Sequence, residues 1–167
     1  MSSSNSRHEV VIDAGPIIAL ARLDLLGLPA FLFRGALATG VVVDECLANP
    51  RHPEHLAIRT ALEKKQLSRV DWMKPTAMTM WNLDRGEAST IDLAASQGAN
   101  VLVDDLAARR VAKSMGLNTI GTCGLLLEAR HRELILAVRP LLDELARSGY
   151  YLSESLIETV CRLAGEA

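Results

Sequence analysis

Short apolar runs recur along the chain, and two of them end in acidic residues. Residues 9–13 end in Asp13, and residues 101–105 run from three aliphatic residues into the adjacent pair Asp104 and Asp105. A continuous apolar run of this length favours a strand that is buried on both faces, as in a parallel sheet. Two acids at one strand end repel each other unless a cation or a basic residue lies nearby. These strand ends are therefore candidate sites for chemistry.

The apolar spacing between these runs predicts helices that alternate with further strands. Helices are expected at residues 17–26, 28–33, 54–66, 84–96, 107–115, 125–132 and 140–146, and from Ser153 or Ser155 onward. Further strands are expected at residues 36–43, 67–72 and 117–120. The strand at residues 36–43 is expected to lead into a helix that starts near Asp44 and Glu45. The helix at residues 54–66 is amphipathic, with buried positions expected at Leu56, Ile58, Ala61 and Leu62. This alternation predicts an α/β fold with a parallel sheet.

The composition favours one folded domain at residues 9–167, behind a Ser-rich tail at residues 1–8 that is expected to be disordered. Of the 167 residues, 49% are hydrophobic and 4% are aromatic, which favours a core of aliphatic side chains. The net charge of −2 gives no global signal for nucleic acid, so any site for it must be local.

The cysteines and the hydropathy bear on where the protein works. Three widely spaced cysteines, an odd number without metal-ligand spacing, favour a reducing, cytoplasmic compartment. The first residues lack the apolar segment of a signal peptide. No run reaches the ~18 apolar residues that a membrane span needs, so no membrane association is expected.

Several acidic residues fall where a parallel sheet brings distant segments together. Asp13, Asp104 and Asp105 end strands, and Glu45 and Glu87 lie at expected helix starts. Strand carboxyl ends and the first turns of the following helices share one edge of such a sheet. Carboxylates that converge there without His or Cys form a hard oxygen site suited to Mg²⁺ or Mn²⁺. Such a site supports phosphodiester hydrolysis by metal-activated water. Each acid alone also has a structural explanation, such as a helix cap, but the joint pattern is hard to obtain from caps alone.

A local excess of basic residues follows the acidic pair. Residues 106–132 contain five Lys or Arg residues and one Glu. Arg109 and Lys113 share a helix face, and Arg110 lies beside them. A basic surface next to a metal pocket suits the phosphate backbone of a nucleic acid. A solvated helix surface is the other explanation of this run.

Four segments, in this order, carry a family resemblance. They are VVIDAGPIIAL at residues 10–20, RGEA at residues 85–88, VDDLAARRVA at residues 103–112 and GTCGLL at residues 121–126. Together they resemble the PIN domain, and in particular its predicted nucleic-acid-binding branch DUF3368. The ending, with RPLLD and LAGE, is also similar, so the resemblance covers nearly the whole chain from Val10.

The resemblance implies a three-layer α/β/α sandwich with a parallel sheet of about four to five strands. It also implies a Mg²⁺- or Mn²⁺-dependent ribonuclease, a homodimer and, as in many prokaryotic members, a toxin paired with a small antitoxin protein. The acidic quartet of the family corresponds to Asp13, Glu45, Glu87 and Asp105, which would be catalytic. The metal ligands would be Asp13, Glu87 and Asp105, with Asp104 as a further or alternative ligand.

Two positions depart from the toxin branch of the family. Glu87 stands where toxins more often have Asp, and Ala107 or Ala108 stands where they often have a further acid. An incomplete metal set would make a weak or one-metal nuclease.

The prediction is therefore a metal-dependent ribonuclease that holds RNA through Arg109, Arg110 and Lys113. The alternative is a catalytically weak or inactive PIN-like module that binds RNA or a partner protein. A phospho-receiver domain would need a Lys at a later strand end, which residues 117–122 do not offer. A haloacid-type phosphatase would need Asp-x-Asp at the first strand, and Gly15 occupies the position of the second Asp.

Overall fold

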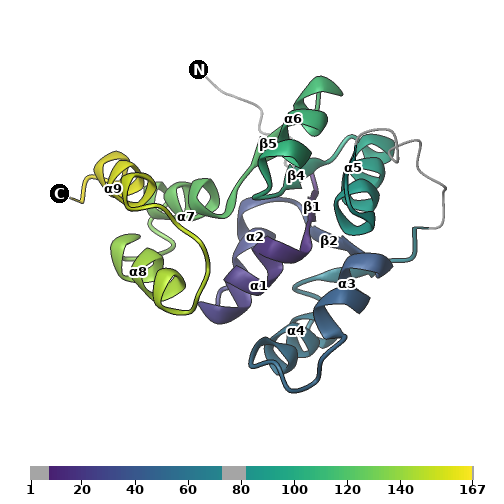
Figure 1. Ribbon diagram of the computed structural model, residues 1–167, viewed down its shortest axis with the longest axis horizontal. Helices are drawn as coiled ribbons and strands as arrows, with labels where there is room; N and C mark the ends of the chain where they lie inside the picture. The colour runs from purple at the N-terminus through teal and green to yellow at the C-terminus, as the bar shows by residue number, and fades with distance from the viewer. Residues whose placement is uncertain (1–7, 73–81, 167) are drawn as a thin grey trace.

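The computed structural model describes residues 8–72 and 82–166, which build a parallel sheet between helices (Figure 1). The strands are β1 (Val10–Ile12), β2 (Ala36–Thr39), β3 (Ser68–Val70), β4 (Asn100–Leu102) and β5 (Thr119–Ile120). They lie in the order β3-β2-β1-β4-β5, and every neighbouring pair is parallel. The predicted α/β class and parallel sheet are confirmed.

Strand β1 lies at the centre of the sheet, where the order of the strands reverses. Val11 pairs with Leu37 of β2 on one side and with Val101 of β4 on the other. The backbone N–H of Asp13 donates to the carbonyl oxygen of Leu102 at 3.0 Å, so β1 and β4 stay together up to their carboxyl ends. Sheets of this kind bind ligands beyond the carboxyl ends of the strands, at the point of reversal. Asp13 lies at this point.

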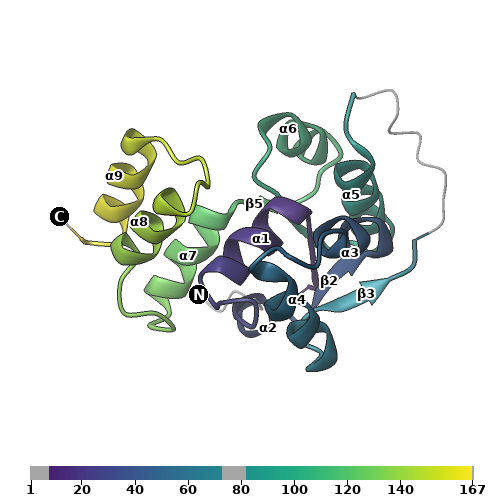
Figure 2. The ribbon, with the colours of Figure 1, turned by 60° about the horizontal axis from the view of Figure 1, so that its bottom comes forward.

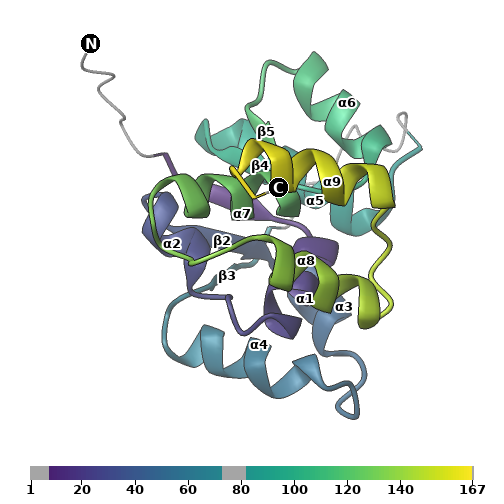
Figure 3. The same ribbon diagram turned by 90° about the vertical axis from the view of Figure 1, so that its left-hand side faces the viewer.

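Helices cover both faces of the sheet. One face carries α5 (Arg85–Gln97) and α6 (Leu106–Ser114). The other face carries α1 (Ala14–Arg22), α2 (Leu28–Leu32), α3 (Gly40–Leu47), α4 (Glu54–Glu63), α7 (Thr122–His131), α8 (Arg139–Arg147) and α9 (Glu154–Leu163). Figure 2 shows α7, α8 and α9 at one end of the molecule, and Figure 3 shows the sheet between α5 and α6 on one side and α1 and α4 on the other. The predicted three-layer sandwich is confirmed.

Alternating side chains of the central strand pack into two separate hydrophobic cores, one on each face of the sheet. Val10 and Ile12 pack with α1 and the helices of its face, whereas Val11 packs with α5 and α6. All three side chains are buried, as expected for a strand that is covered on both faces. This double burial explains the continuous apolar run in the sequence.

The prediction of a strand at residues 36–43 is wrong for the second half of this range. Strand β2 ends at Thr39, and the three valines that follow belong to α3. Thr39 Oγ1 accepts a hydrogen bond from Val42 N at 3.3 Å and caps this helix, which outweighs the strand preference of valine. Glu45 consequently lies in the second half of α3 and not at a helix start.

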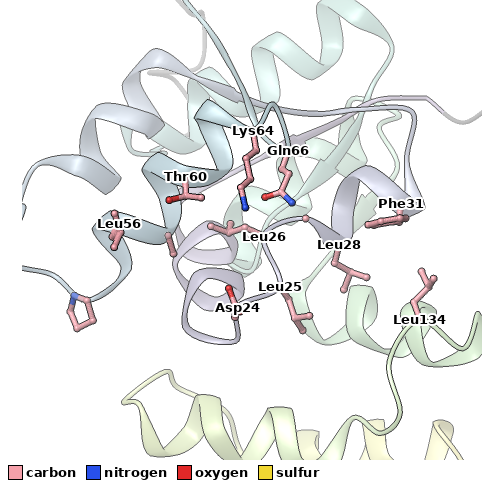
Figure 4. Close-up of a pocket in the computed structure, with 13 residues that line it drawn as sticks. Asp24, Leu25, Leu26, Leu28, Phe31, Leu56, Thr60, Lys64, Gln66 and Leu134 are labelled. Atoms are coloured by element: carbon pink, nitrogen blue, oxygen red, sulfur yellow. The ribbon is translucent and has the colours of Figure 1, made fainter.

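The structure differs from two further predictions, the start of α1 and the burial of Leu56. Helix α1 begins at Ala14, earlier than expected, because Asp13 is extended and takes the N-cap position. On α4, Ile58 and Ala61 are buried as expected, but Leu56 is 73% exposed. Its side chain faces a cavity instead of the core (Figure 4).

This cavity of ≈ 740 Å³ lies between α4 and the segment that follows α1 (Figure 4). Exposed apolar side chains border it, among them Phe31, Leu56 and Leu134. Asp13 precedes α1 at its N-cap position, and the cavity borders the residues that follow the end of α1, so the cavity lies at the opposite end of this helix from Asp13.

Residues 1–7 of the tail that was expected to be disordered lie outside the described residues. Among the helices of the described part of the chain, none is long and apolar enough to cross a membrane.

Candidate active site

Asp13 is the buried acid at the end of the central strand. Its side chain makes no capping hydrogen bond to α1, and only 9% of the residue is exposed. Burial is the main reason that the pKa of its carboxyl is raised to about 7. A backbone hydrogen bond with Ala14 opposes this shift, and three nearby carboxylates add to it, those of Asp84, Glu87 and Glu45. Capping therefore does not explain Asp13.

Three carboxylates surround the backbone of Gly86, the second residue of α5. The place that a Cβ atom would take there lies 3.0 Å from Glu45 Oε2, 3.3 Å from Asp84 Oδ1 and 3.5 Å from Asp13 Oδ1. The fold thus brings Asp13 and Glu45 together from β1 and α3. A side chain at position 86 would fill the space between the three carboxylates.

Glu45 and its neighbour Asp44 point in different directions, as adjacent residues on a helix must. Arg69 Nη1 donates to Asp44 Oδ1 at 2.5 Å, and this pairing lowers the pKa of the Asp44 carboxyl. For Glu45, burial raises the pKa of the carboxyl, and the charge of Asp84 raises it further. Glu45 therefore belongs to the acidic cluster and Asp44 does not.

The first turn of α5 contributes Glu87 and an acid that sequence reasoning missed, Asp84. Asp84 Oδ1 accepts a hydrogen bond from Glu87 N at 2.8 Å, and Glu87 Oε2 accepts one from Asp84 N at 3.1 Å. This reciprocal pair is a capping box, and its Asp-x-x-Glu spacing is visible in the sequence. Burial raises the pKa of the Glu87 carboxyl, and the charges of Asp84, Asp105 and Glu45 raise it further.

A buried pair of hydroxyls fixes α3 and α5 beneath these carboxylates. Thr39 Oγ1, which caps α3, lies 2.8 Å from Ser89 Oγ. Ser89 Oγ also donates to the carbonyl oxygen of Gly86 at 2.9 Å. The turn that carries Gly86 and Glu87 is therefore tied to the end of β2.

The two adjacent acids after β4 have different partners. Asp105 Oδ1 caps α6 by accepting a hydrogen bond from Ala108 N at 2.9 Å, and its charge acts on Glu87. Asp104 accepts hydrogen bonds from Thr122 N at 2.7 Å and Thr122 Oγ1 at 2.6 Å, and a third from Tyr150 Oη. Asp105 is therefore the member of the pair that faces the acidic cluster, and Asp104 ties β4 to α7 and to the segment between α8 and α9.

The basic residues of α6 also divide into two kinds. Arg110 and Lys113 are exposed. Arg109 instead turns back toward the sheet, where its Nη2 donates to the carbonyl oxygen of Val103 at 3.1 Å and lies 4.0 Å from Asp104 Oδ1. The guanidinium of Arg109 thus supports the end of β4, and the outward basic surface of α6 is formed by Arg110 and Lys113.

The donor set fits a hard divalent cation, because every acid of the cluster offers carboxylate oxygen. The nearby Cys46 thiol has its pKa raised to about 12, mainly by burial, so it is protonated at neutral pH. Within residues 8–72 and 82–166, no group of three or more Asp, Glu, His or Cys side chains is already close enough to hold a metal ion. The raised pKa values of Asp13, Glu45 and Glu87 reflect burial first and the neighbouring negative charges second, and a nearby cation would favour the charged carboxylates.

A parallel sheet with carboxylates near its point of strand reversal defines an α/β protein with a candidate binding site at that edge. The chain belongs to the PIN domain family, since the model of the family DUF3368, a PIN domain, matches residues 9–166. PIN domains are generally nucleases, and they typically use divalent metal ions.

Among solved structures, the chain is similar to a PilT N-terminus domain protein from the hyperthermophilic archaeon Sulfolobus solfataricus P2. The TM-score is 0.55 and the sequence identity 18%, over 72% of this chain and 92% of that chain. This likeness shows the fold. No curated protein matches the chain.

Replacing Asp13 with Asn is expected to stabilise the protein without metal at pH 8. In the folded protein the Asp13 carboxyl binds its proton more tightly, with a pKa of about 7 against an ordinary value of 3.8. The stability that this provides is complete below pH ~4 and is lost as the pH rises through ~7. Above that range the buried charge costs on the order of 2–4 kcal/mol. In EDTA, Asp13→Asn should raise the melting temperature by roughly 5–10 °C at pH 8.

The same comparison at pH 4 should show little difference, because there the Asp13 carboxyl is protonated in the folded protein and about half protonated in the unfolded chain. Asp44→Asn, which removes an exposed and paired carboxylate, is the matched control and should show no gain at either pH. A melting temperature that falls in Asp13→Asn at pH 8 would show that the carboxylate stabilises the fold instead.

Replacing Tyr150 with Phe is expected to destabilise the protein. Burial and the charge of Asp104 raise the pKa of the Tyr150 hydroxyl, which therefore stays protonated and donates to Asp104. Its loss leaves a carboxylate oxygen short of a donor, at roughly 1–3 kcal/mol. Chemical denaturation should measure this loss, whereas Tyr151→Phe, at a residue that is 89% exposed, should unfold like the wild type.

Proposed function

We propose that this protein is a metal-dependent endoribonuclease that hydrolyses RNA phosphodiester bonds with Mg²⁺ or Mn²⁺. The observation that carries the proposal is the convergence of the Asp13 and Glu45 carboxylates around Gly86, at the point of strand reversal. The acid Asp13 is buried there without a capping role. Membership in a family of nucleases supports the same conclusion.

In this proposal Asp13, Glu45, Glu87 and Asp105 form the catalytic set. Asp13, Glu87 and Asp105 would hold the cation, and Asp104, whose oxygens accept three hydrogen bonds, would hold the backbone around it. A bound divalent cation supplies charge for the phosphate and a lowered pKa for water. The capping box keeps the Glu87 carboxylate close to α5, and Asp105 is oriented by the first turn of α6.

The biological setting proposed is that of a toxin-like ribonuclease, cytoplasmic and homodimeric, with a small antitoxin protein as partner. Its support is the resemblance to prokaryotic PIN toxins. Expression of the wild-type chain should arrest growth and Asp13→Asn should not. A small open reading frame next to the gene, whose product relieves the arrest, would identify the antitoxin.

A second candidate is a catalytically weak PIN-like module that binds RNA or a partner protein. The capping hydrogen bonds favour it, because Glu87 Oε2 and Asp105 Oδ1 are engaged with backbone N–H groups. A module of this kind would bind RNA in EDTA and leave it uncut when Mn²⁺ is added.

Cleavage of single-stranded RNA is expected in Mn²⁺ or Mg²⁺ and should be abolished by EDTA. Asp13→Asn and Glu45→Gln should each lower the rate by at least about 100-fold, because each removes a negative charge from the proposed catalytic set. Asp44→Asn is the matched control, since Asp44 neighbours Glu45 but pairs with Arg69, and it should keep full activity. RNA that stays intact with the wild type in either metal would reject the nuclease in favour of the binding module.

Replacing both Arg110 and Lys113 with Ala is expected to weaken RNA binding equally for all sequences. Each lost phosphate contact should lower the slope of log affinity against log salt by about 0.7 on a single strand. Affinity is measured at several salt concentrations in the Asp13→Asn background, so that the strand stays intact. Arg59→Ala on α4 is the matched control, because it removes an exposed Arg far along the chain from α6. An unchanged slope in the double variant would assign this face of α6 to another partner.

A further inference from the structure

The acids of the cluster have no basic partner, although acids directly beside them do. Within residues 8–72 and 82–166, no ion pair involves Asp13, Glu45, Asp84, Glu87 or Asp105. Asp44 and Asp104, which are neighbours of cluster members in the sequence, each lie within 4.0 Å of an Arg side chain. The fold therefore places Arg beside the adjacent acids and leaves the negative charge of the cluster unbalanced.

The backbone of Gly86 lies between carboxylates from three different elements. Gly86 is buried in the first turn of α5, and the place that a Cβ atom would take there is 3.0 to 3.5 Å from three carboxylate oxygens. Glu45 comes from α3, Asp13 from the end of β1 and Asp84 from the N-cap of α5. Asp13 is only 9% exposed, so a carboxylate that is nine-tenths buried points at this space.

The backbone conformation at position 86 does not require glycine. Gly86 is helical and lacks the positive φ that Gly98 has at the end of the same helix. Alanine has the higher helix propensity, so glycine is locally unfavourable here. A Cβ atom at 3.0 Å from Glu45 Oε2 would, however, force that carboxylate to move. What the position requires is space beside the three carboxylates.

Asp84 does more than cap α5. Its Oδ1 accepts the capping hydrogen bond from Glu87 N, and in the described part of the chain its Oδ2 has no hydrogen-bond partner. Burial is the largest cause of the raised pKa of Asp13, Glu45 and Glu87, and the charge of Asp84 is the largest contribution from a neighbouring carboxylate in all three. Asp84 thus acts on the whole cluster and has an oxygen left for a ligand.

We propose that Asp84 is a further ligand of the divalent cation and that Gly86 keeps open the space in which Asp13, Glu45 and Asp84 reach it. This inference rests on the metal dependence in the proposed function and adds a ligand outside the acidic quartet. Glu45 and Asp84 are exposed, so their carboxylates can rotate onto an ion without movement of the backbone. A side chain at position 86 would exclude the ion.

The test is calorimetric binding of Mn²⁺ alone to the full chain, without RNA. Asp84→Asn keeps an acceptor for the capping hydrogen bond, because Asn and Asp are similarly good N-caps, but it removes the charge. It should weaken Mn²⁺ binding at least about 10-fold, while the melting temperature in EDTA should not fall. Gly86→Ala should weaken Mn²⁺ binding at least about as much, because the added methyl group takes the space between the carboxylates.

Each variant has a matched control. Asp44→Asn removes a carboxylate next to Glu45, and Gly124→Ala adds a methyl group in the first turn of α7, 3.2 Å from Ile120 Cγ1 and away from any carboxylate. Both should bind Mn²⁺ like the wild type. Wild-type Mn²⁺ affinity in Asp84→Asn or in Gly86→Ala would overturn the inference and leave Gly86 as a contact between α3 and α5. If Gly86→Ala does not fold, Asp84→Asn decides.

RNA cleavage, measured beside Mn²⁺ binding, separates this inference from the proposed function. If the wild type cleaves RNA with Mn²⁺ but Asp84→Asn binds Mn²⁺ normally, the nuclease stands and the inference fails. If Mn²⁺ binding depends on Asp84 and Gly86 but no RNA is cut, the inference stands and the nuclease fails. A wild type that binds no Mn²⁺ would overturn both.

Discussion

The burial of a carboxylate beside other carboxylates, at the end of the central strand, is the constraint on which the site depends. A parallel sheet with reversed strand order directs the end of β1 and the first turns of its neighbouring helices to one place. Asp13 is buried there, and its neighbours Glu45 and Asp84 add negative charge, so the pKa of Asp13 is raised to about 7. The fold holds this arrangement through the hydrophobic burial of β1 and through the buried hydroxyl pair of Thr39 and Ser89. A cation bound beside these carboxylates would relieve the repulsion between their negative charges.

The adjacent acids after β4, Asp104 and Asp105, have identical side chains but different hydrogen-bond partners. Asp105 starts α6 and faces the cluster, whereas both oxygens of Asp104 accept hydrogen bonds from Thr122 and one from Tyr150. Asp104 thereby ties the edge of the sheet to the C-terminal helices, which lie at one end of the molecule (Figure 2). Tyr150, in the segment between α8 and α9, supplies the contact that joins these helices to the sheet.

Local sequence signals predicted elements well where burial and capping agreed, and failed where they competed. The run at residues 9–13 is a strand buried on both faces, and Gly98 ends α5 in the left-handed conformation that favours glycine. The valines at residues 41–43 have strand propensity, yet they are helical because Thr39 caps α3. Leu56 fits the apolar spacing of α4 but faces a cavity and is 73% exposed.

The sequence by itself determined the class of fold, the acids at the strand ends and the hard-oxygen chemistry of the site. Hydrophobic periodicity and residue type are local properties, and they are sufficient for these conclusions. The tertiary structure decided which acids meet: Glu45 reaches the cluster from the second half of α3, Asp84 joins it, and Asp104 leaves it for Thr122 and Tyr150. The tertiary structure also decided the direction of the Arg109 side chain, which donates to the carbonyl oxygen of Val103. These outcomes depend on contacts between residues far apart in the chain, and sequence spacing does not encode the direction in which a side chain finds its partner.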